Sequence, residues 1–351
     1  EVKAIVGGRG DKTASKTLNR ATDTTRQPGS TFKILAAYSA ALDAGGLTLA
    51  SVQDDAPYTY AGANGKSVNN YDRRYRGFTT LREAINIVTV KTLAQAGVSL
   101  GWQYVQEYGF TTVDSRDMNE ALALGGITQG VSNLELTAAY AAIANQGTYI
   151  KPKFYTKILD HDGNVLIDNT TPESHTVIKD TTAWLLTSAM EDVMTSGTGT
   201  SAYFGSSMAQ AGKSGTTTSS RDALFAGYTP YYTCAVWGGY DDNAMQKGSD
   251  TNYPKRIWKA VMKRIHENLA YKDFTKPSGI VAVAVCKESG KLPIEGVCDH
   301  DPRGNCVITE YFAQGTEPTE YCDHHTVANI CTASNMLAGS YCPAETVTTG
   351  V

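Results

Sequence analysis

Several familiar hydrolase and nucleotide-binding signatures are absent from this sequence of 351 residues. It contains no G-x-S-x-G elbow and no H-E-x-x-H helix, which excludes the usual α/β-hydrolase and zincin patterns. Gly212-Lys213-Ser214 ends like a phosphate-binding loop, but Ser207 stands where that loop requires its first glycine. The six histidines are scattered, and none flanks Ser30 in a recognisable triad pattern.

The chain also lacks a strong charge of one sign and a long apolar run. Its net charge is −4 with both signs interspersed, which offers no electrostatic footprint for nucleic acid. No uninterrupted apolar stretch reaches membrane-spanning length, and no signal peptide is recognisable. Residues 1–272 hold a single cysteine, Cys234, whose strand-like surroundings predict a buried free thiol.

What the sequence does contain is a serine at the mouth of a predicted helix, followed by a lysine. Pro28-Gly29 breaks the preceding chain, and the helix predicted from Ser30 runs to a stop at Gly45-Gly46. Ser30 and Lys33 are three residues apart and therefore share one helix face. A lysine whose pKa is lowered by burial or by a second cation can take the serine proton. An isolated S-x-x-K also arises by chance, with the serine as a helix cap and the lysine solvated.

A second short motif, Gly212-Lys213-Ser214-Gly215-Thr216-Thr217, lies far downstream. It offers a cation and a row of hydroxyls, and Lys213 is the candidate for the second cation beside Lys33. Taken alone, such a K-S-G tripeptide is more often a surface turn. Together the two motifs predict the two ends of one acyl-transfer site.

Further motifs occur along residues 1 to about 272 in a characteristic order. They are Val2-Lys3-Ala4-Ile5-Val6-Gly7-Gly8-Arg9, Asn19-Arg20-Ala21-Thr22 leading into Arg26-Gln27-Pro28-Gly29-Ser30, Asn70-Tyr71-Asp72, Leu81-Arg82-Glu83-Ala84, Leu124-Gly125-Gly126, the Gly212–Thr217 motif and Phe225-Ala226-Gly227-Tyr228-Thr229-Pro230. As an ordered set they resemble the transpeptidase domain of class A penicillin-binding proteins, bifunctional enzymes that polymerise and cross-link bacterial peptidoglycan.

The resemblance implies a role for each matching residue. Ser30 would attack the penultimate D-alanine of a stem peptide, with Lys33 as general base and Lys213 as the neighbouring cation. Ser214 and Thr216 would hold the terminal carboxylate on an edge strand, and Gly215 and Thr218 would complete the substrate-binding set. The backbone amides of Ser30 and Thr216 would form an oxyanion hole. β-Lactam antibiotics resemble the substrate and should acylate Ser30; no cofactor and no metal are expected at this site.

One family motif, S-x-N, departs from the expected pattern. Asn86 fits the asparagine of that motif, but Ala84 then occupies the position of its serine. Ser67-Val68-Asn69 is the only S-x-N in the chain, and by its order we interpret it as a decoy. Taken without the resemblance, residues 80–97 predict one helix that begins at a Thr80–Glu83 capping box and ends at Gly97. A continuous helix leaves no room for the loop that carries the S-x-N motif.

The pattern of strands and helices predicts a mixed α/β (α+β) fold. Residues 223–239 indicate strand, turn and strand, and helices are predicted over 133–146 and 181–195. This pattern favours an antiparallel sheet flanked by helices. The resemblance implies the penicillin-binding protein/serine β-lactamase-like fold, with a mostly helical subdomain and the active site between the two.

The composition changes at about residue 273, so we predict a transpeptidase domain over residues 1–272 and a cysteine-rich extension over 273–351. Six of the seven cysteines lie in the extension, which predicts a disulfide-stapled appendage with 15 possible pairings. A zinc site is the less favoured alternative, because two C-x-x-C knuckles are lacking. Its candidate ligands are Cys298, His300, Cys322, His324 and His325.

The resemblance also places the chain in a larger protein. Glu1-Val2-Lys3 begins within the family's first strand, so a glycosyltransferase domain and a membrane anchor are expected upstream. The catalytic domain would then face the extracytoplasmic side of a bacterial cell membrane, where peptidoglycan stem peptides and β-lactams are its partners. Two other functions stay open: a β-lactamase or D,D-carboxypeptidase, and a catalytically impaired penicillin-fold scaffold.

Overall fold

The computed structural model describes residues 1–11, 13–61, 66–83, 88–246 and 251–351. These residues form two compact units, each with segments that are distant in the sequence. The first unit consists of residues 1–47, 59–68 and 89–278, and the second of residues 48–58, 69–88 and 279–351. Among the described residues, no helix has both the length and the apolar character that crossing a bilayer requires.

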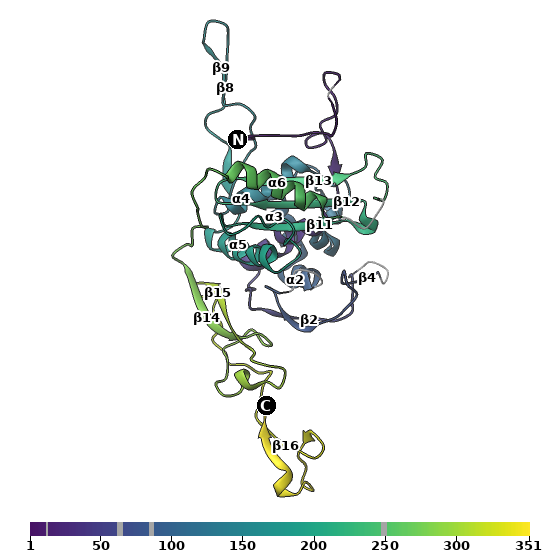
Figure 1. Cartoon of the computed structure of the whole chain (residues 1–351), viewed down its shortest axis with the longest axis vertical. Coiled ribbons are helices and arrows are strands. Elements are labelled where there is room, and N and C mark those ends of the chain that lie inside the picture. Colours follow the sequence, from purple (N-terminus) through teal and green to yellow (C-terminus); the bar gives the residue numbers. More distant parts are fainter. Residues whose placement is uncertain (12, 62–65, 84–87, 247–250) are drawn as a thin grey trace. The chain divides into compact units, whose positions relative to one another are not determined.

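A three-stranded antiparallel sheet forms the centre of the first unit (Figure 1). Its order is β11-β12-β13, with bounds Ala211–Thr216, Asp222–Tyr228 and Thr233–Gly239. The strand, turn and strand predicted over residues 223–239 are thereby confirmed. The remaining strands of this unit are β1 (Thr25–Arg26), β3 (Tyr58–Thr59), β4 (Ser67–Val68), β6 (Val131–Ser132), β7 (Thr148–Ile150), β8 (Lys157–Leu159), β9 (Val165–Asp168) and β10 (Ser174–Thr176).

Helices cover both faces of this sheet. Every residue of the central strand β12 is buried, and its side chains point alternately to the two faces. Phe225 packs edge-on against Trp258 of helix α6 (Tyr253–His266), with ring centroids 5.2 Å apart. Tyr228 lies on the other face, since it stands three positions after Phe225 and side chains alternate along a strand. There its hydroxyl lies 2.7 Å from that of Thr187 on α5 (Asp180–Thr195). This packing confirms the expected sheet flanked by helices.

The other helices agree with most of the sequence predictions. Helix α4 (Asn133–Ala144) begins with a capping box from Ser132 and ends before Gly147, whose φ of 87° suits glycine. The chain between Gly29 and Asp43 is helical almost throughout, as predicted from its apolar spacing. The other elements are α1 (Ser39–Asp43), α2 (Val88–Ala96), α3 (Val98–Glu107) and the short turns η3 (Ser115–Asp117), η4 (Glu120–Leu124) and η5 (Thr218–Ser220).

The helix predicted to start at Thr80 is wrong at its beginning. Thr80 ends strand β5 (Gly77–Thr80), which pairs antiparallel with β2 (Val52–Asp55). The next two backbone N–H groups donate outside any helix, from Leu81 to Ser51 and from Arg82 to Leu49. The Glu83 N–H donates to the Thr80 hydroxyl at 3.4 Å, as the capping box predicts, but residues 81–83 form a turn and no helix begins at Leu81. Ala84 and Asn86 lie outside the described residues.

The second unit is built around the hairpin of β14 (Ile280–Cys286) and β15 (Val307–Ala313). Val285 and Phe312 from this hairpin pack on Ala50, so the early segment shares the core of the late one. Residues near the C-terminus form a second small sheet of β17 (Met336–Leu337), β16 (Ala328–Cys331) and β18 (Val347–Gly350). Two short turns, η6 (Cys298–His300) and η7 (Ala344–Thr346), complete this unit.

The expected disulfide staple is not found in this unit. All seven cysteines of the chain are free thiols, including Cys234, which is partly buried on β13. Cys286, Cys298, Cys306 and Cys322 instead share one small buried cluster. The prediction went wrong because cysteine count and loop-rich composition do not show whether thiols meet in pairs or in a group.

Candidate active site

The turn that carries Ser30 is fixed on both sides by buried hydrogen bonds. Gly29 has a φ of 54°, and a short 3₁₀ turn, η1 (Gly29–Thr31), follows it. The Thr31 hydroxyl donates back to the Pro28 carbonyl at 2.7 Å, and the Tyr140 hydroxyl of α4 donates to the Thr31 carbonyl at 2.7 Å. Ser30 itself is half-buried. The serine is thus held in place by its neighbours and remains partly accessible.

Lys33 opens the π-helix η2 (Lys33–Tyr38), which continues into α1. Between Ser30 and Lys33 the backbone stays helical, with Phe32 at φ −77° and ψ −17°. Side chains three residues apart in so tight a helical turn lie on the same side. A π-helical stretch is rare and often marks a functional site, which no sequence pattern here predicted.

The downstream motif lies on β11, at an edge of the sheet, as expected. Its register pairs Ser214 with Phe225 and Thr216 with Ala223 on β12, and no other described strand pairs with its outer edge. Ser214 is half-buried and Thr216 exposed, whereas Lys213 and Gly215 are buried. The two hydroxyls therefore share the accessible face of the strand. Thr218 lies beyond the strand end, in the turn η5.

Close backbone contacts bring the two motifs together. A methyl group on Gly215 would lie 2.7 Å from the Pro28 carbonyl oxygen, and one on Gly29 would lie 3.0 Å from the Thr216 carbonyl oxygen. One on Gly125 would lie 2.5 Å from the Gly29 carbonyl oxygen. Glycine is required at these positions because the backbones approach too closely for a side chain. Three motifs that are far apart in the sequence therefore meet at the Ser30 turn.

Two buried lysines dominate the electrostatics of this site. Lys33 is 3% exposed and Lys213 is 2% exposed. Burial lowers the pKa of Lys33 well below its usual value, and the charge of Lys213 lowers it further. Burial, with a smaller effect of Lys255, lowers the pKa of Lys213 to about 8. Both effects favour the neutral amine on Lys33, and a pKa of about 8 leaves most of Lys213 charged at neutral pH.

Sequence reasoning missed two residues next to the Ser214 hydroxyl. The Thr198 hydroxyl, in the loop after α5, lies 2.8 Å from Ser214 Oγ. Lys255 Nζ on α6 donates to the Thr198 carbonyl at 2.9 Å. The run Thr195–Thr200 indicates a turn, but nothing in its residues signals that it lies against β11. These contacts add a third hydroxyl and a third lysine near the motif.

A buried carboxylate supports the end of β11. Asp222 accepts hydrogen bonds from the Thr217 hydroxyl at 3.0 Å and from the Trp237 indole at 2.9 Å. The guanidinium of Arg26 lies over the Trp237 ring, 5.5 Å from its centroid. This group ties the residue after Thr216 to the neighbouring strands. No part of the sequence analysis identified it.

The arrangement can activate a hydroxyl and bind an anion. A neutral amine on Lys33, one helical turn after the half-buried Ser30, can accept the serine proton and so activate the hydroxyl as a nucleophile. Charged Lys213 and the hydroxyls of Ser214, Thr216 and Thr198 suit a carboxylate. In the described residues, the clusters of histidine, cysteine and carboxylate that could hold a metal ion both lie in the second unit.

Comparison with known proteins shows the family of this chain. The family profile described as "Penicillin binding protein transpeptidase domain" matches residues 1–266, and that described as "Penicillin-binding protein 1A, C-terminal domain" matches residues 276–327. Penicillin-binding protein 1A of Clostridium botulinum is 37% identical over 361 residues, which cover 98% of this chain and 43% of that protein. Penicillin-binding protein 1F of Bacillus subtilis is 38% identical over 291 residues, 80% of this chain and 39% of that protein.

A solved structure shows the same fold. The crystal structure of penicillin-binding protein 1A from Haemophilus influenzae matches with a TM-score of 0.72 and 27% sequence identity. The match covers 87% of this chain and 50% of that one. This chain spans less than half the length of the curated relatives named above. The first 266 residues carry the family profile, and the chain therefore belongs to the penicillin-binding protein transpeptidase family.

Proposed function

We propose that this chain is a serine-type D,D-transpeptidase that cross-links peptidoglycan stem peptides and is acylated by β-lactams. The observation that carries the proposal is the meeting of two buried lysines from two distant motifs. Lys33 follows Ser30 by one helical turn, and burial together with the charge of Lys213 lowers the pKa of Lys33. A neutral lysine beside an activated serine has a clear use in acyl transfer and costs stability otherwise.

In the acylation step, Ser30 Oγ attacks the carbonyl carbon of the penultimate D-alanine. The amine of Lys33 takes the hydroxyl proton as the carbon–oxygen bond forms. The peptide carbon–nitrogen bond then breaks, and the leaving amine of the last D-alanine takes up a proton. The product is an ester between Ser30 and the shortened stem peptide.

Negative charge develops on the carbonyl oxygen during this step, and backbone donors stabilise it. We assign the amides of Ser30 and Thr216 to this oxyanion hole. The close approach of Gly29 to Thr216, 3.3 Å from a methyl position on Gly29 to the Thr216 nitrogen, supports the assignment. Two preorganised donors of this kind are worth about 3 kcal/mol or more in the transition state.

The substrate carboxylate would bind where the hydroxyls gather. We assign Ser214 and Thr216 to the carboxylate, with charged Lys213 nearby and Gly215 leaving room for an extended peptide. The outer edge of β11 would pair with the substrate backbone as an added strand does. Thr218 and Asn86 stay predicted members of the site, since Thr218 lies past the strand and Asn86 is outside the described residues.

The second half-reaction transfers the acyl group to an amine. A neighbouring stem peptide's amine attacks the ester carbon, the bond to Ser30 Oγ breaks, and the serine regains its proton through Lys33. A β-lactam follows the first half-reaction, but its leaving amine stays tethered to the opened ring. The tethered amine blocks the approach of an acceptor amine to the ester carbon, so the ester persists.

The proposal extends to the whole protein. The curated relatives are more than twice as long as the portion matched here. We place a glycosyltransferase domain and a membrane anchor upstream, with this chain on the extracytoplasmic side of a bacterial cell membrane. This context would supply nascent glycan strands with stem peptides close to the active site.

A peptide assay distinguishes the candidate functions. The chain is incubated with a stem peptide that ends in D-Ala-D-Ala and with a D-amino acid as acceptor amine, and products are identified by mass spectrometry. A transpeptidase releases D-alanine and forms the new amide, and Ser30→Ala abolishes both. Release of D-alanine with hydrolysed product only would identify a carboxypeptidase. No release from a folded sample would contradict an enzymatic function.

A further inference from the structure

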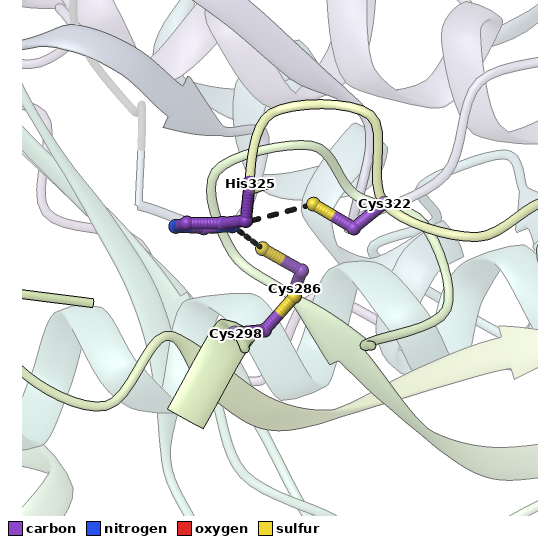
Figure 2. Close-up of side chains that lie close together, drawn as sticks. All are labelled: Cys286, Cys298, Cys322 and His325. Atoms are coloured by element: carbon purple, nitrogen blue, oxygen red, sulfur yellow. Dashed lines mark hydrogen bonds between the residues drawn. The ribbon is translucent and has the colours of Figure 1, made fainter. Parts of the chain in front are cut away.

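Three cysteines and one histidine converge in the second unit, whereas Ser30, Lys33 and Lys213 belong to the first (Figure 2). The residues are Cys286, Cys298, Cys322 and His325, all buried. Their four ligand atoms all lie within 4.8 Å of one another. Figure 2 shows the sulfurs of Cys286 and Cys322 next to the His325 ring.

The histidine ring is oriented by a carboxylate on its far side. His325 Nε2 lies 2.8 Å from Asp301 Oδ2, so its Nε2–H donates to that oxygen. Nδ1 then carries the lone pair, and it lies 3.4 Å from Cys286 Sγ and 3.3 Å from Cys322 Sγ. Arg303 holds the carboxylate in turn with two side-chain hydrogen bonds of 3.0 and 2.8 Å. A carboxylate behind a histidine is the usual outer partner of a metal-binding imidazole.

The separations fit a tetrahedral zinc ion. With Zn–S and Zn–N bonds of the usual length, sulfur and nitrogen on a tetrahedron lie about 3.6 Å apart and two sulfurs about 3.8 Å apart. The two sulfur–nitrogen distances given above are within a few tenths of an ångström of that value. Thiolate and imidazole ligands select zinc over magnesium or calcium, which take oxygen ligands.

Disulfide pairing explains the cluster less well. Any pair formed among three cysteines leaves the third thiol buried and unpaired, and it gives the oriented His325 nothing to bind. A backbone N–H of Ile294 donates to Cys298 Sγ at 3.2 Å, as backbone amides do around metal thiolates. Four ligands with no open position are typical of a structural zinc site and not of a catalytic one.

We propose that Cys286, Cys298, Cys322 and His325 bind one Zn²⁺ ion as a closed structural site. The ion joins the end of β14 to the turn η6 and to the segment between β15 and β16. Cys306 packs with the three cysteine ligands. In the part of the chain that the structure describes, the partly buried hydrophobic residues packed against these four cysteines are Ile294 and Val307. So small a core gains most of its order from a metal or another cross-link.

The test is metal content and ligand spectroscopy on the full chain. We expect about one zinc per chain after purification with thiol reductant, released when a mercurial reagent blocks the thiols. Replacement by Co²⁺ should give the strong visible bands of a tetrahedral ion and thiolate-to-cobalt charge transfer in the near ultraviolet. Cys298→Ser and His325→Ala should each lower the zinc retained after dialysis by about tenfold or more.

Matched variants define which residues are ligands. Cys331→Ser replaces a buried free cysteine of the same unit and should keep the full zinc content. Cys306→Ser should also keep it, although Cys306 lies close to Asp301 and His325. Penicillin acylation of Ser30 in every variant reports that the catalytic unit is folded, independently of metal. Reduced chain that binds neither zinc nor cobalt, a disulfide among the three cysteines, or zinc loss only in Cys306→Ser would each overturn the proposal.

Discussion

The proposed chemistry depends on two buried lysines, Lys33 and Lys213, which work against the stability of the chain. The pKa of each is lowered by burial, so the folded chain binds fewer protons than the unfolded chain. For Lys213 the cost is complete below its folded pKa of about 8 and fades as the pH rises toward 10.5, its unfolded value. The free energy of unfolding should therefore rise with pH through this interval.

The same two groups predict a bell-shaped pH dependence of acylation. The rate should rise with pH as Lys33 becomes neutral and fall again near pH 8, where Lys213 loses its charge. Lys213→Arg keeps a charge that does not titrate in this range, so the falling limb should move to higher pH. Stopped-flow acylation by a chromogenic cephalosporin measures both profiles. The control is Lys263→Arg, which replaces an exposed lysine on α6. An unchanged falling limb in Lys213→Arg would refute the assignment of that limb to Lys213.

Thr198 offers a test of a residue that the sequence did not reveal. Thr198→Val removes the hydroxyl 2.8 Å from Ser214 Oγ but keeps the shape of the side chain. Loss of one such contact costs up to about 1 kcal/mol, so the second-order acylation rate should fall by roughly fivefold. Thr195→Val, which removes an exposed hydroxyl that donates to Glu191, should leave the rate within error. Equal rates for both variants would show that Thr198 does not support Ser214.

At the residue scale, the sequence predicts the groups to which we assign the chemistry but not the groups that contact them. Ser30, Lys33 and Lys213 stand in short motifs whose local spacing has a chemical meaning. Thr198, Lys255 and Asp222 do not, because each acts through a contact made only in the folded chain. Of the four proposed zinc ligands, the sequence offered Cys298, Cys322 and His325 as candidates of a less favoured site and missed Cys286, since no regular spacing links the four residues.

At the scale of elements, the site depends on how closely β11 approaches the Ser30 turn. Gly215→Ala would put a methyl group 2.7 Å from the Pro28 carbonyl oxygen and 3.0 Å from Thr31 Cγ2. The strand or the turn must shift, and a displacement of such reacting groups by about 1 Å can cost roughly a hundredfold in rate. We expect a large loss of β-lactam acylation by Gly215→Ala.

A glycine in open space is the matched control for that substitution. Nothing lies within 4 Å of a methyl group at Gly339, so Gly339→Ala should acylate like the parent chain. Acylation is followed by intact-protein mass spectrometry at several times. Parent-like acylation by Gly215→Ala would mean that the close approach is not needed.

Elements were predicted well where local signals and packing agree. Helices α4 and α5 and the strands β12 and β13 follow from their apolar spacing and their turn residues. The helix assigned from Thr80 does not begin there, because backbone hydrogen bonds from Leu81 to Ser51 and from Arg82 to Leu49, about 30 residues away, hold a turn after β5. The π-helix at Lys33 has no sequence signature, since its residues fit an ordinary helix equally well.

At the scale of the whole molecule, the second unit is assembled from early and late segments. Arg82 and Glu310 link them through two short hydrogen bonds of 2.7 and 2.8 Å. The side chain of Glu310 is only 1% exposed, so its charge is compensated inside the unit. Loss of one partner from such a buried pair leaves the other charge buried and unpaired.

Arg82→Gln should therefore destabilise the second unit by about 3 kcal/mol. The free energy of unfolding is measured by chemical denaturation at neutral pH. Arg116→Gln removes an ion pair with Asp114, and because that arginine side chain is 59% exposed, the free energy of unfolding should change far less than in Arg82→Gln. Similar small losses for both variants would show that the buried pair contributes little.

Metal removal gives a prediction for the same unit. A chelator that strips the proposed zinc should make residues 287–327 susceptible to limited proteolysis, because the ion supplies folding energy there. Acylation of Ser30 by penicillin should stay unchanged, since Ser30, Lys33 and Lys213 lie in the first unit. The cleavage sites are mapped by mass spectrometry. A proteolytic pattern that is identical with and without chelator would argue against a structural ion.

The account as a whole is tested most directly by the covalent adduct with penicillin. The chain and its Ser30→Ala variant are incubated with a penicillin, and intact masses and peptide maps locate the adduct. The account predicts one stable acyl group per chain on the peptide that contains Ser30, and none in Ser30→Ala. An adduct elsewhere, or no adduct on a folded chain that also hydrolyses no antibiotic, would contradict it.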